Sequence, residues 1–173
     1  MISNNMNIYG NLPRILVVAG IIVVIALFIN NLAVFAGLIV ASMLLSLFVN
    51  KTNIRNIGVE FILLTTVFAG INYGPEAGAI VGFVLITFHL IVAQYMGPYV
   101  LWVIPQYALA GFLAGKFASI IDLGFYLAIL MNAIGILCTF VFTKDDIGEY
   151  VPYAITNLIF NFLIFKFLAP AIF

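Results

Sequence analysis

His89 is the single histidine of the chain, and it stands within a long apolar run. It lies seven positions after Gly82 and eleven after Gly78. On a helix of about 3.6 residues per turn, this spacing puts it within about 20° of the face that carries both glycines. A histidine that faces other helices in a membrane can contact a substrate or a metal ion, or it can titrate. It can equally be a structural residue, hydrogen-bonded to a carbonyl, to Asn132 or to Asn157. No second histidine, cysteine or carboxylate follows at a metal-ligating spacing, so we expect no metal site.

Amide and aromatic side chains in other apolar runs could complete a site around this histidine. Asn157 and Asn161 are four residues apart, so they share one face of a helix, and Asn132 lies near the middle of another run. Such amides join membrane helices, and they would also suit a neutral ligand that forms hydrogen bonds. Trp102 and Gln106 belong either to an aromatic belt at the membrane surface or to a pocket mouth. The predicted substrate-binding residues are His89, Trp102, Gln106, Asn132, Asn157 and Asn161.

Residue sets that carry out catalysis are missing from the sequence. It contains no carboxylate pair, Ser-His-Asp set, CxxC motif or phosphate-binding GxxxxGK[ST] loop, so we expect neither enzymatic activity nor a cofactor. Glu60 is the one carboxylate that begins an otherwise apolar run, and it could pair with Arg55. Glu76 directly follows Gly74 and Pro75, a position where a carboxylate stabilises the positive end of a helix.

The composition predicts an integral membrane protein. The chain is 66% hydrophobic and 7% charged over 173 residues, with a mean hydropathy of +1.29, whereas a soluble domain usually carries about 25% charged residues. Six basic and six acidic residues cancel, which leaves no basic surface for nucleic acid. We expect the lipid bilayer of the cell (plasma) membrane as the surroundings, and other membrane subunits as partners.

Apolar runs of about 17 to 25 residues mark the membrane spans that would position the polar residues. The sequence predicts an all-α, polytopic protein, a compact bundle of six or seven transmembrane helices in one integral membrane domain. It has a polar tail at 1–11, an N-terminal helical hairpin at 12–49 that could be re-entrant, and further helices at 57–173. The runs are Leu12–Ile29, Leu32–Val49, Gly58–Asn72, Pro75–Tyr95, Tyr99–Ile120, Gly124–Thr143 and Tyr150–Ile172.

Small residues recur at helical spacing and predict close helix packing. Gly74, Gly78 and Gly82 share one helix face, so we expect Pro75–Tyr95 to be among the most enclosed helices. Stripes at Ala33–Ala41 and Ala110–Ala118 could instead meet a partner subunit. The predicted packing or partner residues are Ala33, Gly37, Ala41, Gly74, Gly78, Gly82, Gly111 and Gly115.

The order of these motifs over about residues 57 to 173 resembles the substrate-binding S components of energy-coupling factor (ECF) transporters. The resemblance rests on a Gly-Pro turn that opens a glycine-striped span, a later G-x-x-x-G stretch, and a last span that begins near a proline. The residues that carry it are Gly74, Pro75, Gly78, Gly82, Gly111, Gly115 and Pro152. The family usually has an acidic residue after the glycine stripe, where this chain has Thr87 and His89.

That resemblance implies a noncatalytic subunit that binds a vitamin-like small molecule and depends on separate ATPase and coupling subunits. A structural or assembly subunit of a larger membrane complex, with no small-molecule substrate, is the alternative. A polar cavity around His89 would favour the first function. Polar groups that all pair internally would favour the second.

Overall fold

The computed structural model describes residues 31–51, 57–94, 96–118, 122–143 and 147–173, and in these ranges every regular element is a helix. The predicted all-α class is therefore confirmed for this part of the chain. Predicted span Leu12–Ile29 lies outside the described residues, and so does the choice between six and seven spans. The helices are α2 (Asn31–Lys51), α3 (Ile62–Tyr73), α4 (Pro75–Val92), α5 (Val100–Lys116), α6 (Leu123–Phe142) and α7 (Ile147–Leu163), the last continued by the π-helical turn η2 (Ile164–Leu168) and by α8 (Ala169–Ile172).

Four helical stretches in the described ranges are long and apolar enough to cross a membrane, and they make this chain an integral membrane protein by length and composition. Helices α3 and α5 are apolar but shorter. The predicted span began at Gly58, but helix α3 begins at Ile62, and residues 57–61 before it are not helical. The four long stretches are Asn31–Val49, Pro75–Val92, Leu123–Phe142 and Tyr150–Ile172.

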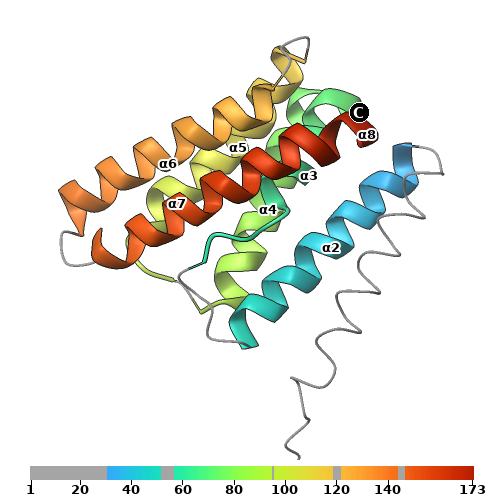
Figure 1. Cartoon of the computed structure of the whole chain (residues 1–173). Helices are drawn as coiled ribbons and strands as arrows, with labels where there is room; N and C mark the ends of the chain where they lie inside the picture. Colours follow the sequence, from blue (N-terminus) through green and yellow to red (C-terminus); the bar gives the residue numbers. More distant parts are fainter. Residues whose placement is uncertain (1–30, 52–56, 95, 119–121, 144–146) are drawn as a thin grey trace, which may run out of the picture.

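Helix α3 lies at the centre of the bundle. It contacts α2, α4, α5 and α6, and α6 runs beside α7 on one side of it (Figure 1). All nine residues from Ile62 to Gly70 are buried. Helix α4, which the glycine stripe led us to expect among the most enclosed, is no less buried than the other three long helical stretches, but it leaves Phe83 and Val84 about half exposed. A glycine stripe allows close approach along one face only, and the opposite face of α4 is free to meet lipid.

Helices α3, α4 and α5 pack backbone against backbone through glycines. A Cβ added at Gly78 would strike the carbonyl oxygen of Gly111, and one added at Gly111 would strike the carbonyl oxygen of Gly78. Gly82 lies in the same way against the carbonyl of Tyr107, and Gly115 against the backbone of Pro75. These contacts leave no room for a side chain at Gly78, Gly82, Gly111 or Gly115.

Gly74 serves a different purpose from the other glycines of the predicted stripe. Apart from its two chain neighbours, the one described residue that an added Cβ there would approach is Glu76, with Oε2 at 3.9 Å, so Gly74 does not pack against another described helix. Its φ is +99°, a backbone conformation that other residues rarely adopt, and it ends α3 while beginning α4. Its place in the predicted packing set is therefore corrected to a role in the turn.

We expect Gly74→Ala to lower the free energy of unfolding by about 1–2 kcal/mol, the cost of forcing a Cβ into a left-handed conformation. Thermal unfolding of the purified protein in detergent measures the change. Gly148→Ala is the matched control, because a Cβ at Gly148 has nothing within 4 Å. Equal melting temperatures for the two variants would contradict this role of Gly74.

The alanine stripe of α5 faces the inside of the bundle. Ala110 and Ala114 are 2% and 0% exposed, and Ala114 Cβ lies against the position of an added Cβ at Gly70 of α3. Ala110 and Ala114 therefore pack within the chain, whereas Ala118 at the end of the predicted stripe is exposed. On α2, Ala41 is buried, whereas Ala33 and Gly37 are half-buried.

Candidate binding site

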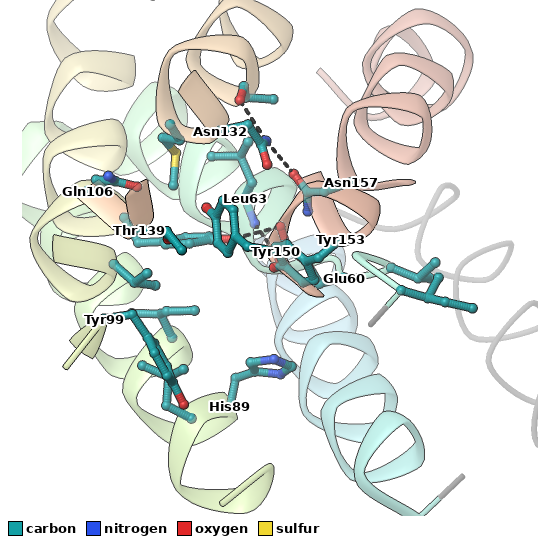
Figure 2. Close-up of a pocket in the computed structure, with 18 of the residues that line it drawn as sticks. Glu60, Leu63, His89, Tyr99, Gln106, Asn132, Thr139, Tyr150, Tyr153 and Asn157 are labelled. Carbon is teal, nitrogen blue, oxygen red and sulfur yellow. Dashed lines mark hydrogen bonds between the residues drawn. The ribbon is translucent and has the colours of Figure 1, made fainter. Parts of the chain in front are cut away.

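A cavity of about 270 Å³ lies between the non-helical residues before α3 and helices α4, α5, α6 and α7 (Figure 2). Its walls are mainly apolar, with a few polar groups among them, which is the usual character of a small-molecule site. The polar lining residues are Glu60, His89, Tyr99, Gln106, Tyr107, Asn132, Thr139, Thr143, Tyr150, Tyr153 and Asn157.

Residues 57–61 form one wall of this cavity in a non-helical conformation. The twelve residues of α3 rise about 18 Å, well short of the roughly 30 Å of a membrane interior. Irregular backbone in a membrane protein is tolerated where it is buried in protein or lines a cavity. Gly58 and Glu60 are buried, and Ile57, Val59 and Glu60 line the cavity. The irregular segment therefore extends the short helix α3 at its N-terminal end.

Helix α7 supplies the hydrogen bonds that the irregular segment lacks. The N–H of Gly58 donates to Thr156 Oγ1 at 2.8 Å, and the carbonyl of Gly58 accepts from Asn157 Nδ2 at 3.1 Å. A Cβ added at Gly58 would meet Asn157 Cβ and the carbonyl of Tyr153, so the backbones of the two segments are in direct contact. Gly58 is thus held against α7, while Val59 and Glu60 line the cavity.

Glu60 places a carboxylate in the wall of the cavity. Its side chain is 4% exposed, Oε1 accepts from Tyr107 Oη–H at 2.9 Å, and Oε2 accepts from the N–H of Leu63 at 3.1 Å. Because Leu63 is in the first turn of α3, the carboxylate also faces the positive end of that helix. The predicted partner Arg55 lies outside the described residues. Sequence reasoning singled out Glu60 as unusual but did not include it in the site.

His89 is buried on α4, and its ring reaches α2. Nδ1 lies 3.0 Å from Ser46 Oγ, and Ser46 Oγ lies 2.8 Å from the carbonyl of Ser42, to which it donates. A serine hydroxyl has one proton, so Ser46 accepts from Nδ1–H, and this assigns the proton of a neutral ring to Nδ1. Nε2 is then an acceptor, and it forms no hydrogen bond with a described residue. The hydrogen-bond partner is thus Ser46, and neither Asn132 nor Asn157.

Three asparagines connect α6, α7 and the irregular segment. Asn132 Nδ2 donates to Asn157 Oδ1 at 2.8 Å, and Asn161 Nδ2 donates to the same oxygen at 3.1 Å. Asn157 Nδ2 donates in turn to the carbonyl of Gly58, so the side-chain amide of Asn157 forms hydrogen bonds with Asn132, Asn161 and Gly58. Asn132 and Asn157 line the cavity, but Asn161, which is fully buried, does not.

Two polar groups of the cavity wall lack a hydrogen-bond partner among the described residues. Thr139 Oγ1 and Gln106 Nε2 are both buried without one, and both residues line the cavity. Trp102 of the predicted set does not line the cavity, since its ring stacks on Phe142 at a centroid distance of 6.0 Å. The structure therefore gathers His89, Gln106, Asn132 and Asn157 around one cavity and leaves out Trp102 and Asn161.

The cavity also contains tyrosines that sequence reasoning did not assign to it. Tyr150 and Tyr153 come from the first turns of α7, three residues apart and with ring centroids 5.8 Å apart, and Tyr107 comes from α5. The spacing of Tyr150, Tyr153 and Asn157 at intervals of three and four is a signal that could have placed them on one helix face. Tyr107 has no such spacing to another tyrosine of the cavity.

Comparison with known proteins identifies no family. No protein-family model, no curated protein and no solved structure matches this chain. The function is therefore argued from the cavity.

Proposed function

We propose that this chain is a noncatalytic membrane subunit that binds a small molecule, as the substrate-binding subunits of ECF transporters do. The observation that carries the proposal is the cavity with unpartnered polar groups in its wall. A buried polar group without a hydrogen bond costs about 1–3 kcal/mol. Thr139 and Gln106 both line the cavity, so a turn of either side chain would bring its unpartnered atom, Oγ1 or Nε2, to a ligand or an ordered water.

The irregular segment before α3 supports the same proposal. In membrane transporters, non-helical backbone and helix termini near the middle of the membrane typically form the substrate site. Here Val59, Glu60 and Leu63 in the first turn of α3 all line the cavity. We propose that the ligand is vitamin-like in size and is taken up across the cell membrane. The chain has no GxxxxGK[ST] sequence, so partner subunits would supply the energy from ATP.

A structural subunit without a ligand is the second candidate, and the asparagine network favours it. Asn132, Asn157 and Asn161 bond to one another, as interhelical amides with a purely structural role would. The cavity and its unpartnered groups favour ligand binding, because a purely structural bundle gains nothing from them.

His89→Ala tests the proposal through the small molecules that remain bound to the purified chain. The amount of small molecule bound to the variant should be at least about fivefold lower than the amount bound to the wild-type chain. This is the effect of losing one hydrogen bond of about 1 kcal/mol between Nε2 and the ligand. Mass spectrometry of the denatured protein identifies and quantifies what was bound.

Ser46→Ala is the matched control for this experiment. Both variants lose the hydrogen bond between α2 and α4, but only His89→Ala also removes Nε2, which has no hydrogen-bond partner among the described residues. We expect similar melting temperatures and a loss of ligand in His89→Ala alone. Equal retention in the two variants would sink the proposed role of His89, and a wild-type chain that retains no small molecule would count against ligand binding altogether.

A further inference from the structure

The described wall of the cavity contains an acidic residue, Glu60, and no lysine or arginine. Lys116 and Lys166, the basic residues whose side chains are described, are both exposed and do not line the cavity. Tyr107 Oη–H and the N–H of Leu63 donate hydrogen bonds to Glu60, and both bonds favour the ionised carboxylate. A buried carboxylate is costly unless an opposite charge pairs with it.

Two further groups of the wall are acceptors in need of donors. His89 Nε2 has no partner among the described residues, because the proton of the neutral ring is on Nδ1. The amide of Asn132 donates through Nδ2 to Ala128 and Asn157, and its Oδ1 accepts no hydrogen bond from a described residue. A ligand with several N–H donors would satisfy these acceptors together with the remaining lone pairs of Glu60.

Four tyrosines line the cavity together with Glu60. Tyr107 contacts the carboxylate directly, and Tyr99, Tyr150 and Tyr153 line the same cavity. Figure 2 shows Tyr150 and Tyr153 near Glu60, with His89 and Asn132 toward opposite ends of the cavity. The face of a tyrosine ring attracts a cation, more strongly where water is excluded. A carboxylate among tyrosines therefore favours a positively charged group.

We propose that the cavity binds a small organic cation, whose charged nitrogen lies at Glu60 among the tyrosines. This inference rests on the proposed function and adds the class of ligand. A divalent metal ion is disfavoured, because no group of three or more His, Cys, Asp or Glu side chains that could hold one is found in the part of the chain described. The volume of about 270 Å³ is just below the range of roughly 300–1,000 Å³ usual for ligand pockets, which indicates a compound of about one ring.

Three probes of the same shape and different charge test the inference on the full chain in lipid nanodiscs. Benzamidinium is positive, benzamide is neutral and benzoate is negative, and isothermal titration calorimetry measures each affinity. We expect benzamidinium to bind at least about tenfold more tightly than benzamide, and benzoate to bind most weakly. Equal affinities, or no binding of any probe, would overturn the organic-cation class. A small molecule found on the purified chain would still support the proposed function in that case.

Two variants locate the source of the preference. Glu60→Gln keeps the size of the side chain and an oxygen for Tyr107, and it should abolish the preference for benzamidinium over benzamide. Glu76→Gln removes the same charge at an exposed position outside the cavity, and it should leave the preference unchanged. A preference that persists in Glu60→Gln would overturn the assignment. If that variant fails to fold, the comparison of the three probes on the wild-type chain still decides.

Discussion

Gly111→Leu is expected to prevent assembly of the helix bundle. Any Cβ at this position strikes the carbonyl of Gly78 and the Cγ2 of Thr66, so α5 would have to move away from both α3 and α4. These three helices form the most tightly packed part of the fold, and a shift of one disturbs both contacts. We expect the free energy of unfolding to fall by more than about 4 kcal/mol, a loss typical of severe core disruption.

The yield of monodisperse protein on size-exclusion chromatography, followed by thermal unfolding, measures this effect. Gly148→Leu is the control, because it makes the same replacement in a helix where an added Cβ has nothing within 4 Å. We expect normal yield from Gly148→Leu and almost none from Gly111→Leu. Similar yields and melting temperatures for the two would contradict the close contact of α4 and α5.

The second large effect is expected from Asn157→Leu. This change removes the donor to the carbonyl of Gly58 and the acceptor that Asn132 and Asn161 share. Asn132 and Asn161 each keep a second hydrogen bond to a backbone carbonyl, whereas the carbonyl of Gly58 loses the contact that α7 provides. Each buried group left unsatisfied costs about 1–3 kcal/mol, so a total loss of roughly 2–4 kcal/mol is expected.

Equilibrium unfolding in mixed micelles measures the change, with Asn72→Leu as the control. Asn72 also forms side-chain hydrogen bonds, but it is half-buried and far from the cavity wall. Because Asn157 fixes residues 57–61, the variant should also lose affinity for the probe benzamidinium, whereas Asn72→Leu should keep it. Equal stability of the two variants would show that the irregular segment does not depend on α7.

Local patterns account for the part of this fold that the sequence predicts. Long apolar runs give the spans because each helix satisfies its own backbone hydrogen bonds, whatever its neighbours are. The spacing of Gly78 and Gly82 places them on one face of a helix, again whatever the neighbours of that helix are. The start of α3 could not be found in this way, since Gly58 bonds to Thr156 and Asn157, about a hundred positions away in the chain.

The candidate site was predictable only in part, because its residues come from the irregular segment before α3 and from each of the helices α2 to α7. His89 could be placed inside the bundle from its distance to the glycines along one helix. Glu60 and Tyr107 are 47 positions apart, and neither residue alone indicates the hydrogen bond between them. Trp102 was assigned to the site by residue type, and its stacking on Phe142 depends on how α5 meets α6. The arrangement of helices, which periodicity does not encode, decides these contacts.

The reciprocal contact of Gly78 and Gly111 restricts how this protein can change over evolutionary time. In most packed cores, a larger residue at one position can be compensated by a smaller one opposite, because the total volume is conserved. Here Gly78 lies opposite Gly111 and Gly111 lies opposite Gly78, so the residue opposite is a glycine for each of them. The atoms that obstruct a side chain at either position are backbone carbonyls. Neither position can therefore change first, and neither can be repaired by a second substitution at the other.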